Sequence, residues 1–124
     1  MKTLKITKAD IKDGKYIAGT VDFDGHVEIG AALGYVVFVS LKATGSIVAA
    51  RGTGIEAGWG IEAGWGIEAG WGIEAGTTIS VKLRIFAGLV MWRKPTESEM
   101  EIRCKRLDSG EIAYGKLIET IKEG

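Results

Sequence analysis

The stretch GIEAGWGIEAGWGIEAGWGIEAG, from Gly54 to Gly76, decides the fold. It is a perfect six-residue repeat in which Ile, Ala and Trp occupy odd-numbered positions and Glu occupies even-numbered positions. Successive side chains of a β-strand point to opposite faces, so an alternation with a period of two predicts strands. A helix would show a period of 3.6 residues, which the repeat does not have.

The same alternation extends far beyond the repeat. Between Val21 and Met91, 31 of the 36 odd positions are apolar, against 7 of the 35 even positions, and the pattern keeps one register throughout. One straight strand of this length would run about 230 Å at ~3.3 Å per residue, so the chain must coil. We therefore predict a β-solenoid, with glycines at the corners because glycine tolerates positive φ angles and close backbone approach.

Six residues per face and three faces per coil give about 18 residues per turn, as in hexapeptide β-helices. This register predicts that Ile55 stacks on Ile73. By the same spacing Ile61 stacks on Ile79, and Ile67 on Ile85. About four coils of this size fit between Val21 and Met91.

Three repeat tryptophans, Trp59, Trp65 and Trp71, share the inward parity. We expect them in the core, although three indoles in one coil require a wide cross-section or paired coils. The competing interpretation is that the repeat face is open, in which case the tryptophans form an aromatic strip that binds a partner.

Both ends of a solenoid need caps, because they leave strand edges and core open. We expect a single domain in which residues 1–20 form N-terminal cap strands, residues 21–92 form the solenoid, and residues 93–124 form the C-terminal cap. Asp13-Gly14 is a hairpin-turn signal in the first segment, and Asp24-Gly25 is a second such signal.

The C-terminal segment favours a β-hairpin, with strands over Glu101–Leu107 and Glu111–Ile121 around Asp108-Ser109-Gly110. The alternative is a short helix that starts at Glu97, with Thr96 as its N-cap.

Few residues of the chain could carry out catalysis. His26, the only histidine, follows a turn signal and is expected to be solvated, and Cys104, the only cysteine, is expected to be buried and structural. We expect no metal and no cofactor, and we expect the protein not to be an enzyme. A lone cysteine, the absence of an apolar leader segment and the absence of a membrane-length apolar run favour a cytoplasmic protein.

Charge is balanced overall, with 16 basic and 16 acidic residues, but it is unevenly distributed. Seven acidic and two basic residues lie between Val21 and Ser80, whereas seven basic and three acidic residues lie between Lys82 and Arg106. One interpretation is a solvated outer surface. The other is an acidic surface that competes for a basic, nucleic-acid-binding groove on another protein, and direct binding of nucleic acid is not expected. The candidate partner-binding residues are Glu56, Glu62, Glu68, Glu74, Arg93 and Lys94.

The I-x-A-G-x-G repetition, followed by IFAGLVMWRKP and EIRCKRLDSGEIAYGKLI, resembles small repeat proteins of prophages and mobile elements. The resemblance covers about Gly54 to Ile118. It implies a β-helical fold and a non-catalytic, phage-encoded inhibitor that acts in the host cytosol on a host effector, such as a CRISPR–Cas nuclease. It supplies no catalytic residues.

Two other functions remain open at this point. The first is a structural module that forms homo-oligomers through its solenoid edges. The second is a solenoid that binds a carbohydrate or another ligand through exposed tryptophans.

Overall fold

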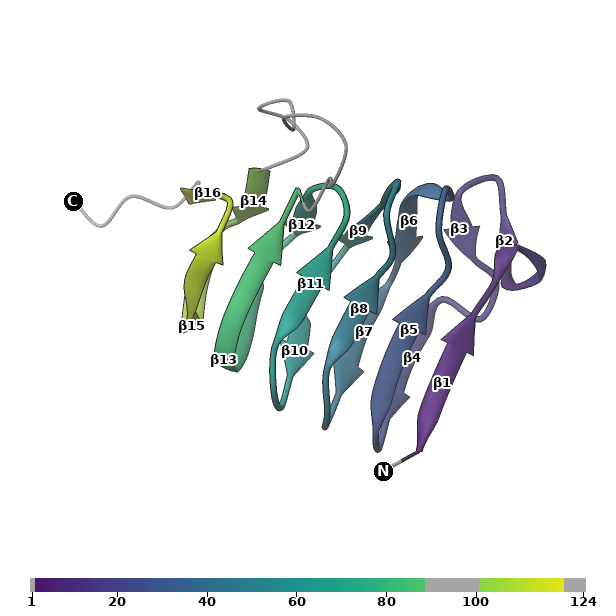
Figure 1. Cartoon of the computed structure of the whole chain (residues 1–124), viewed down its shortest axis with the longest axis horizontal. Coiled ribbons are helices and arrows are strands. Elements are labelled where there is room, and N and C mark those ends of the chain that lie inside the picture. The colour runs from purple at the N-terminus through teal and green to yellow at the C-terminus, as the bar shows by residue number, and fades with distance from the viewer. Residues whose placement is uncertain (1, 89–100, 120–124) are drawn as a thin grey trace.

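A computed structural model describes residues 2–88 and 101–119, the side chain of Arg106 excepted, and shows a short β-solenoid of about four turns (Figure 1). Its strands stack into three flat faces, which we call the first, second and third faces. All pairs between coils are parallel, as in a chain that winds in one direction.

The three faces contain strands from every part of the described chain. The first face consists of β4 (Thr20–Phe23), β7 (Ser40–Ala43), β10 (Ile61–Ala63) and the first half of β13 (Thr78–Ala87). The second face consists of β1 (Thr3–Ile6), β5 (His26–Ile29), β8 (Ile47–Ala49), β11 (Ile67–Ala69) and the second half of β13. The third face consists of β3 (Lys15–Tyr16), β6 (Gly34–Phe38), β9 (Thr53–Ala57), β12 (Ile73–Ala75), β14 (Glu101–Cys104) and β16 (Lys116–Glu119). The long β15 (Arg106–Tyr114) pairs with both halves of β13.

The predicted stacking of the repeat is confirmed. Ile55 pairs with Ile73, Ile61 with Ile79, and Ile67 with Ile85. Each repeat places Ile and Ala inward and Glu outward on one three-residue strand, and all of these Ile and Ala side chains are buried. Within the repeat, the apolar core therefore follows from the six-residue period. The predicted coil of 18 residues does not hold before the repeat, where Val21 pairs with Leu41 and Leu41 with Ile61, each 20 residues apart.

The core closes at its N-terminal end with larger side chains. Phe38 occupies an inward position on the third face. The later coils have Ala57 and Ala75 at the same position. The ring of Tyr16 packs on that of Phe38 at 5.3 Å between centroids. Tyr16 belongs to a hairpin of β2 (Ile11–Lys12) and β3, which follows a short 3-10 helix, η1 (Lys8–Asp10), and turns at Asp13 and Gly14, as predicted. The hairpin caps the third face.

Several corner glycines of the repeat are required because neighbouring coils come close there. A Cβ on Gly64 would overlap the carbonyl oxygen of Thr44, and one on Gly70 would lie 2.6 Å from that of Ala50. None of the glycines from Gly54 to Gly76 has a positive φ. Close approach, and not left-handed backbone, is thus the reason for glycine at Gly64 and Gly70.

The expectation that the tryptophans fill the core is wrong. Trp59 and Trp65 are 66% and 49% exposed, and Trp71 is half-buried. Each lies at a corner between two faces, where the chain bends and the side chain projects from the convex side. Alternation with a period of two holds only along extended chain, so the parity of a corner residue does not give its direction.

The alternation leaves the odd register on β6 and returns to it at Leu41 on β7, a change that the sequence pattern concealed. On β6 the buried residues are the even-numbered Val36 and Phe38. The preceding corner contains one additional residue, and Ala32 and Gly34 adopt φ angles of 57° and 69° there. The buried Thr53 hydroxyl holds this corner: it donates to the Gly30 carbonyl at 2.6 Å and accepts from a backbone N–H at 3.2 Å.

Both ends differ from the predicted caps. β1 pairs in parallel with β5 and so belongs to the coil stack, and Asp24-Gly25 forms a corner between β4 and β5 instead of a hairpin. The prediction of a C-terminal hairpin is wrong, because β14, β15 and β16 each pair in parallel with the preceding coil. Its expected turn lies within β15, where Gly110, with φ 116°, bends the chain around a corner. The alternative helix from Glu97 lies outside the described residues, as do Met91, Arg93 and Lys94.

Candidate functional site

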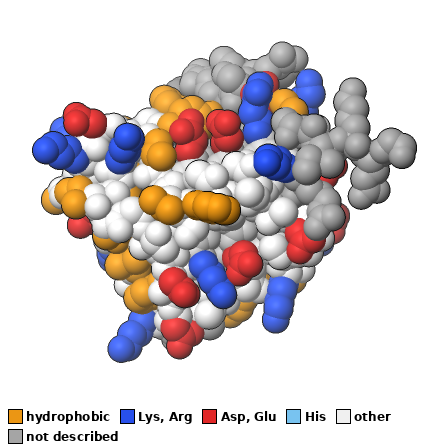
Figure 2. Space-filling view, turned by 180° about the vertical axis from the view of Figure 1, so that it is seen from behind, with side chains coloured by type: hydrophobic (Ala, Val, Ile, Leu, Met, Phe, Trp, Pro, Cys, Tyr) orange, Lys and Arg blue, Asp and Glu red, His pale blue; other side chains and the backbone are white. Residues whose placement is uncertain are grey.

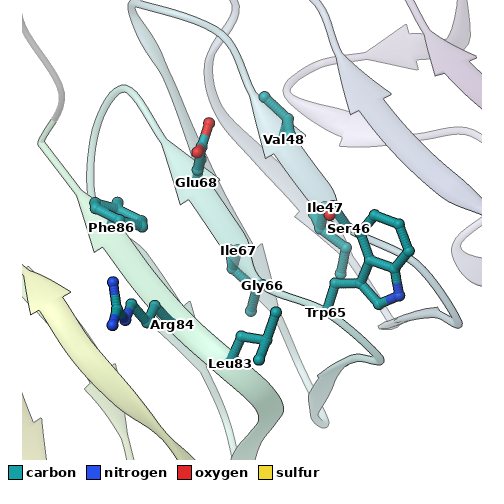
Figure 3. Close-up of a pocket in the computed structure, with 10 residues that line it drawn as sticks. All are labelled: Ser46, Ile47, Val48, Trp65, Gly66, Ile67, Glu68, Leu83, Arg84 and Phe86. Carbon is teal, nitrogen blue, oxygen red and sulfur yellow. The ribbon is translucent and has the colours of Figure 1, made fainter.

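A hollow about 420 Å³ in volume lies on the outside of the second face, the face turned toward the viewer in Figure 1. One wall consists of outward side chains from three successive coils, Val48, Glu68 and Phe86, which are neighbours in register. The other wall consists of the corner residues Trp65 and Leu83 (Figure 3). We call this feature the second-face groove.

Glycine creates the space at the centre of the second-face groove. Gly66 lies between the two walls and has no side chain to fill the gap. The repeat needs glycine here for packing, since a Cβ would lie 2.7 Å from the carbonyl oxygen of Arg84 on the next coil. A requirement of the fold therefore leaves a concave surface with apolar walls.

Trp65 is held in place by the coils beneath it. Its indole packs edge-on against the His26 ring, with centroids 4.9 Å apart. Nδ1 of His26 accepts a hydrogen bond of 2.9 Å from the Ser46 backbone N–H, which fixes the imidazole. Gly45 lies on the coil between the coil of His26 and the coil of Trp65. A Cβ on Gly45 would lie 2.8 Å from His26 Cε1. His26 is half-buried and supports Trp65, so it is less solvated than predicted.

Two charged side chains border the second-face groove. Glu68 has the apolar Val48 and Phe86 as its neighbours in register on either side. Among the described residues no basic group lies within ion-pair distance of it. Arg84 is largely exposed, and its Nε lies 4.0 Å from Glu111 Oε2, a long and weak contact.

The four repeat glutamates do not form a single acidic face. A six-residue step moves the chain by one face, so Glu62 lies on the first face, Glu68 on the second, and Glu56 and Glu74 on the third. Glu62 lies 3.6 Å from Lys42 Nζ. The predicted set of partner-binding residues is therefore divided over the molecule, and Arg93 and Lys94 are outside the described residues.

The third face carries the one place where repeat glutamates meet. Glu56 and Glu74 are neighbours in register, and they line a hollow of about 190 Å³ with Tyr35, Glu101 and Arg103. Burial and the charge of Glu74 raise the pKa of Glu56, and burial raises the pKa of Tyr35. The hydrogen bond from Arg103 Nε, 2.8 Å long, lowers the pKa of Glu101.

Reactive groups are poorly placed for catalysis in the described part of the chain. Cys104 is buried as predicted, 2% exposed, and burial raises the pKa of its thiol, which disfavours the nucleophilic thiolate. No group of three or more His, Cys, Asp or Glu side chains among residues 2–88 and 101–119 could hold a metal ion. The same residues include no helix long and apolar enough to cross a membrane.

Exposed apolar side chains also lie outside the second-face groove. Ile17, Val39 and Trp59 are exposed near the corner between the third and first faces. The view from behind shows hydrophobic side chains in several places on the surface, with acidic and basic side chains around them (Figure 2).

Two residues of the second-face groove stand out in the sequence as exceptions to the alternation. Val48 and Phe86 are two of the few apolar residues at even positions, where outward side chains are expected. Leu83 does not stand out in the same way. It is odd-numbered like the core residues, but it lies at a corner and is exposed.

Comparison with known proteins adds no relative: no family matches the chain, and no curated protein or solved structure is significantly similar to it.

Proposed function

We propose that this protein is a non-catalytic protein-binding module and that it contacts its partner through the second-face groove. The observation that carries the proposal is Trp65, half exposed, beside Leu83, 60% exposed, over a hollow floored by glycine. Tryptophan contributes more binding energy to interfaces than most residues, and clustered exposed apolar side chains mark interaction sites. The His26 contact favours binding further, because a pre-ordered indole loses little conformational freedom.

The partner in this proposal is a host effector protein, such as a CRISPR–Cas nuclease, and the protein is a phage-encoded inhibitor that acts in the host cytosol. The resemblance of the repeat region and the small size of the chain support this part. The division of the glutamates over three faces moves the expected contact from an acidic surface to the apolar second-face groove.

Affinity capture from a CRISPR-bearing host tests the proposal with a matched pair of variants. Trp65→Ser removes the groove tryptophan, and Trp59→Ser removes the equivalent residue of the preceding repeat at another corner. We expect the wild type and Trp59→Ser to retain the same effector protein and Trp65→Ser to lose it at least about tenfold, since one hot-spot residue contributes ~2 kcal/mol or more. Equal capture by both variants, or no protection of phage in a plaque assay, would contradict the proposal.

The second candidate function is a structural module that assembles end to end. Within the described residues, β1 and β4 end the sheet order at one end of the stack, and β15 and β16 lie at the other. Such edges are templates for strand pairing. Filaments in electron micrographs, unaffected by Trp65→Ser, would favour this function over the first.

A further inference from the structure

We infer that, when no other protein occupies it, the second-face groove is covered by a second copy of this chain in a two-fold symmetric dimer. The inference deepens the proposed function, because it rests on the same surface and describes how access to it is regulated. Its starting point is the arrangement of charge around the apolar centre.

The second-face groove carries an acid and a base on opposite sides. In Figure 3, Glu68 and Val48 lie on one side of the line from Phe86 to Trp65, and Arg84 and Leu83 lie on the other. A two-fold axis along that line would bring the same face of a second copy against this one. It brings Glu68 of one copy over Arg84 of the other, and Leu83 over Val48.

The repeat glutamates show why Glu68 suits such a contact. Glu62 has Lys42 beside it at 3.6 Å, and Glu74 has Arg103 as its neighbour in register. Glu68 has the apolar Val48 and Phe86 instead. Arg84, whose one ion pair among the described residues is the long contact with Glu111, is the basic group that a two-fold contact would supply. An interface built on one patch must be complementary to itself, and here the acid Glu68 and the base Arg84 lie on opposite sides of the proposed axis.

The size of the patch predicts a weak dimer. It spans three strands at ~4.8 Å spacing, about 15 Å, and about 20 Å along a strand and its corner. That is on the order of 300 Å² per copy, less than half of the ~800 Å² in a standard stable interface. The dimer is therefore reversible, and a tighter-binding partner displaces it from the same groove.

Sedimentation velocity of the full chain, from about 10 µM to about 1 mM, tests the inference without any partner. We expect the wild type to shift from monomer to dimer across this range. Leu83→Glu should remain monomeric, and Glu68→Arg and Arg84→Glu should each raise the dissociation constant at least about tenfold. The double variant Glu68→Arg/Arg84→Glu should recover dimerisation, because the swapped charges pair again across the two-fold axis.

Glu62→Arg is the matched control, since it reverses the same repeat position on the first face and should dimerise like the wild type. Circular dichroism confirms that each variant is folded. A wild type that stays monomeric at ~1 mM, a double variant no better than the single ones, or an equal loss in Glu62→Arg would each overturn the inference. These results are independent of effector capture, so a monomeric protein that still captures its effector through Trp65 would leave the proposed function standing.

Discussion

At the scale of single residues, the corner glycines and the corner tryptophans depend on each other. Gly64 and Gly66 flank Trp65, and both must lack a Cβ because carbonyl oxygens of adjacent coils come close. The chain can then bend sharply enough for the indole to project outward. The tight packing between coils thus exposes the residue to which we assign binding.

Two glycines at equivalent positions of successive repeats test the packing argument. A Cβ on Gly64 would overlap the Thr44 carbonyl, whereas one on Gly58 would have 3.7 Å to its nearest neighbour, the Val39 carbonyl oxygen. We expect Gly64→Ala to lower the free energy of unfolding by more than about 2 kcal/mol and Gly58→Ala by less than about 1 kcal/mol. Urea denaturation of the two variants measures both values. Equal destabilisation would show that close approach is not the reason for glycine.

At the scale of strands, the six-residue unit explains why much of the fold could be predicted. Ile and Ala lie on extended chain, where parity determines the side, so the three stacked Ile pairs were predicted correctly. Trp65 has the same parity but lies at a bend, and parity carries no information there. Gly110 shows the same limit, because its turn signal suits a hairpin and a solenoid corner equally well. Val48 and Phe86 were visible as exceptions, but only the coil register brings them beside Trp65.

The pairing of β9 with β12 has a consequence for pH dependence, because it sets Glu56 beside Glu74. The folded-state pKa of Glu56 is raised, so its ionisation weakens the folded state. The favourable contribution is present below the ordinary carboxyl pKa of about 4.3 and is lost as pH rises through the raised value. We expect Glu56→Gln to stabilise the protein near pH 7 by less than about 1 kcal/mol, since the site is partly solvated, and to have no effect near pH 3.

Thermal unfolding of Glu56→Gln at both pH values measures this effect. Glu62→Gln serves as the control, because it removes the contact with Lys42 instead of a repulsion and should give no gain at pH 7. A Glu56→Gln gain that persists at pH 3, or no gain at pH 7, would contradict the assignment.

At the scale of the whole molecule, the central claim is that one coil takes three hexapeptides. This period places the three tryptophans at three different corners, separates the glutamates onto three faces, and aligns Glu68 with Phe86 in the second-face groove. Val48, on the coil before the repeat, aligns with Glu68 over a longer step of 20 residues. The proposed binding surface and the proposed dimer both depend on it. A different winding of the same repeat would bring other residues together.

Disulfide trapping of the repeat glutamates measures the period directly. A disulfide requires Cα atoms about 4.4–6.8 Å apart, a spacing that neighbours in register on adjacent strands satisfy. We predict that Glu56→Cys combined with Glu74→Cys forms an intramolecular disulfide rapidly, because these residues pair across β9 and β12, while the buried Cys104 stays reduced. Glu56→Cys combined with Glu62→Cys or with Glu68→Cys should form none, since those residues lie on other faces. Mass spectrometry of the oxidised, monomeric variants measures disulfide formation. A disulfide that forms as readily in either control pair as in the pair at positions 56 and 74 would contradict the account.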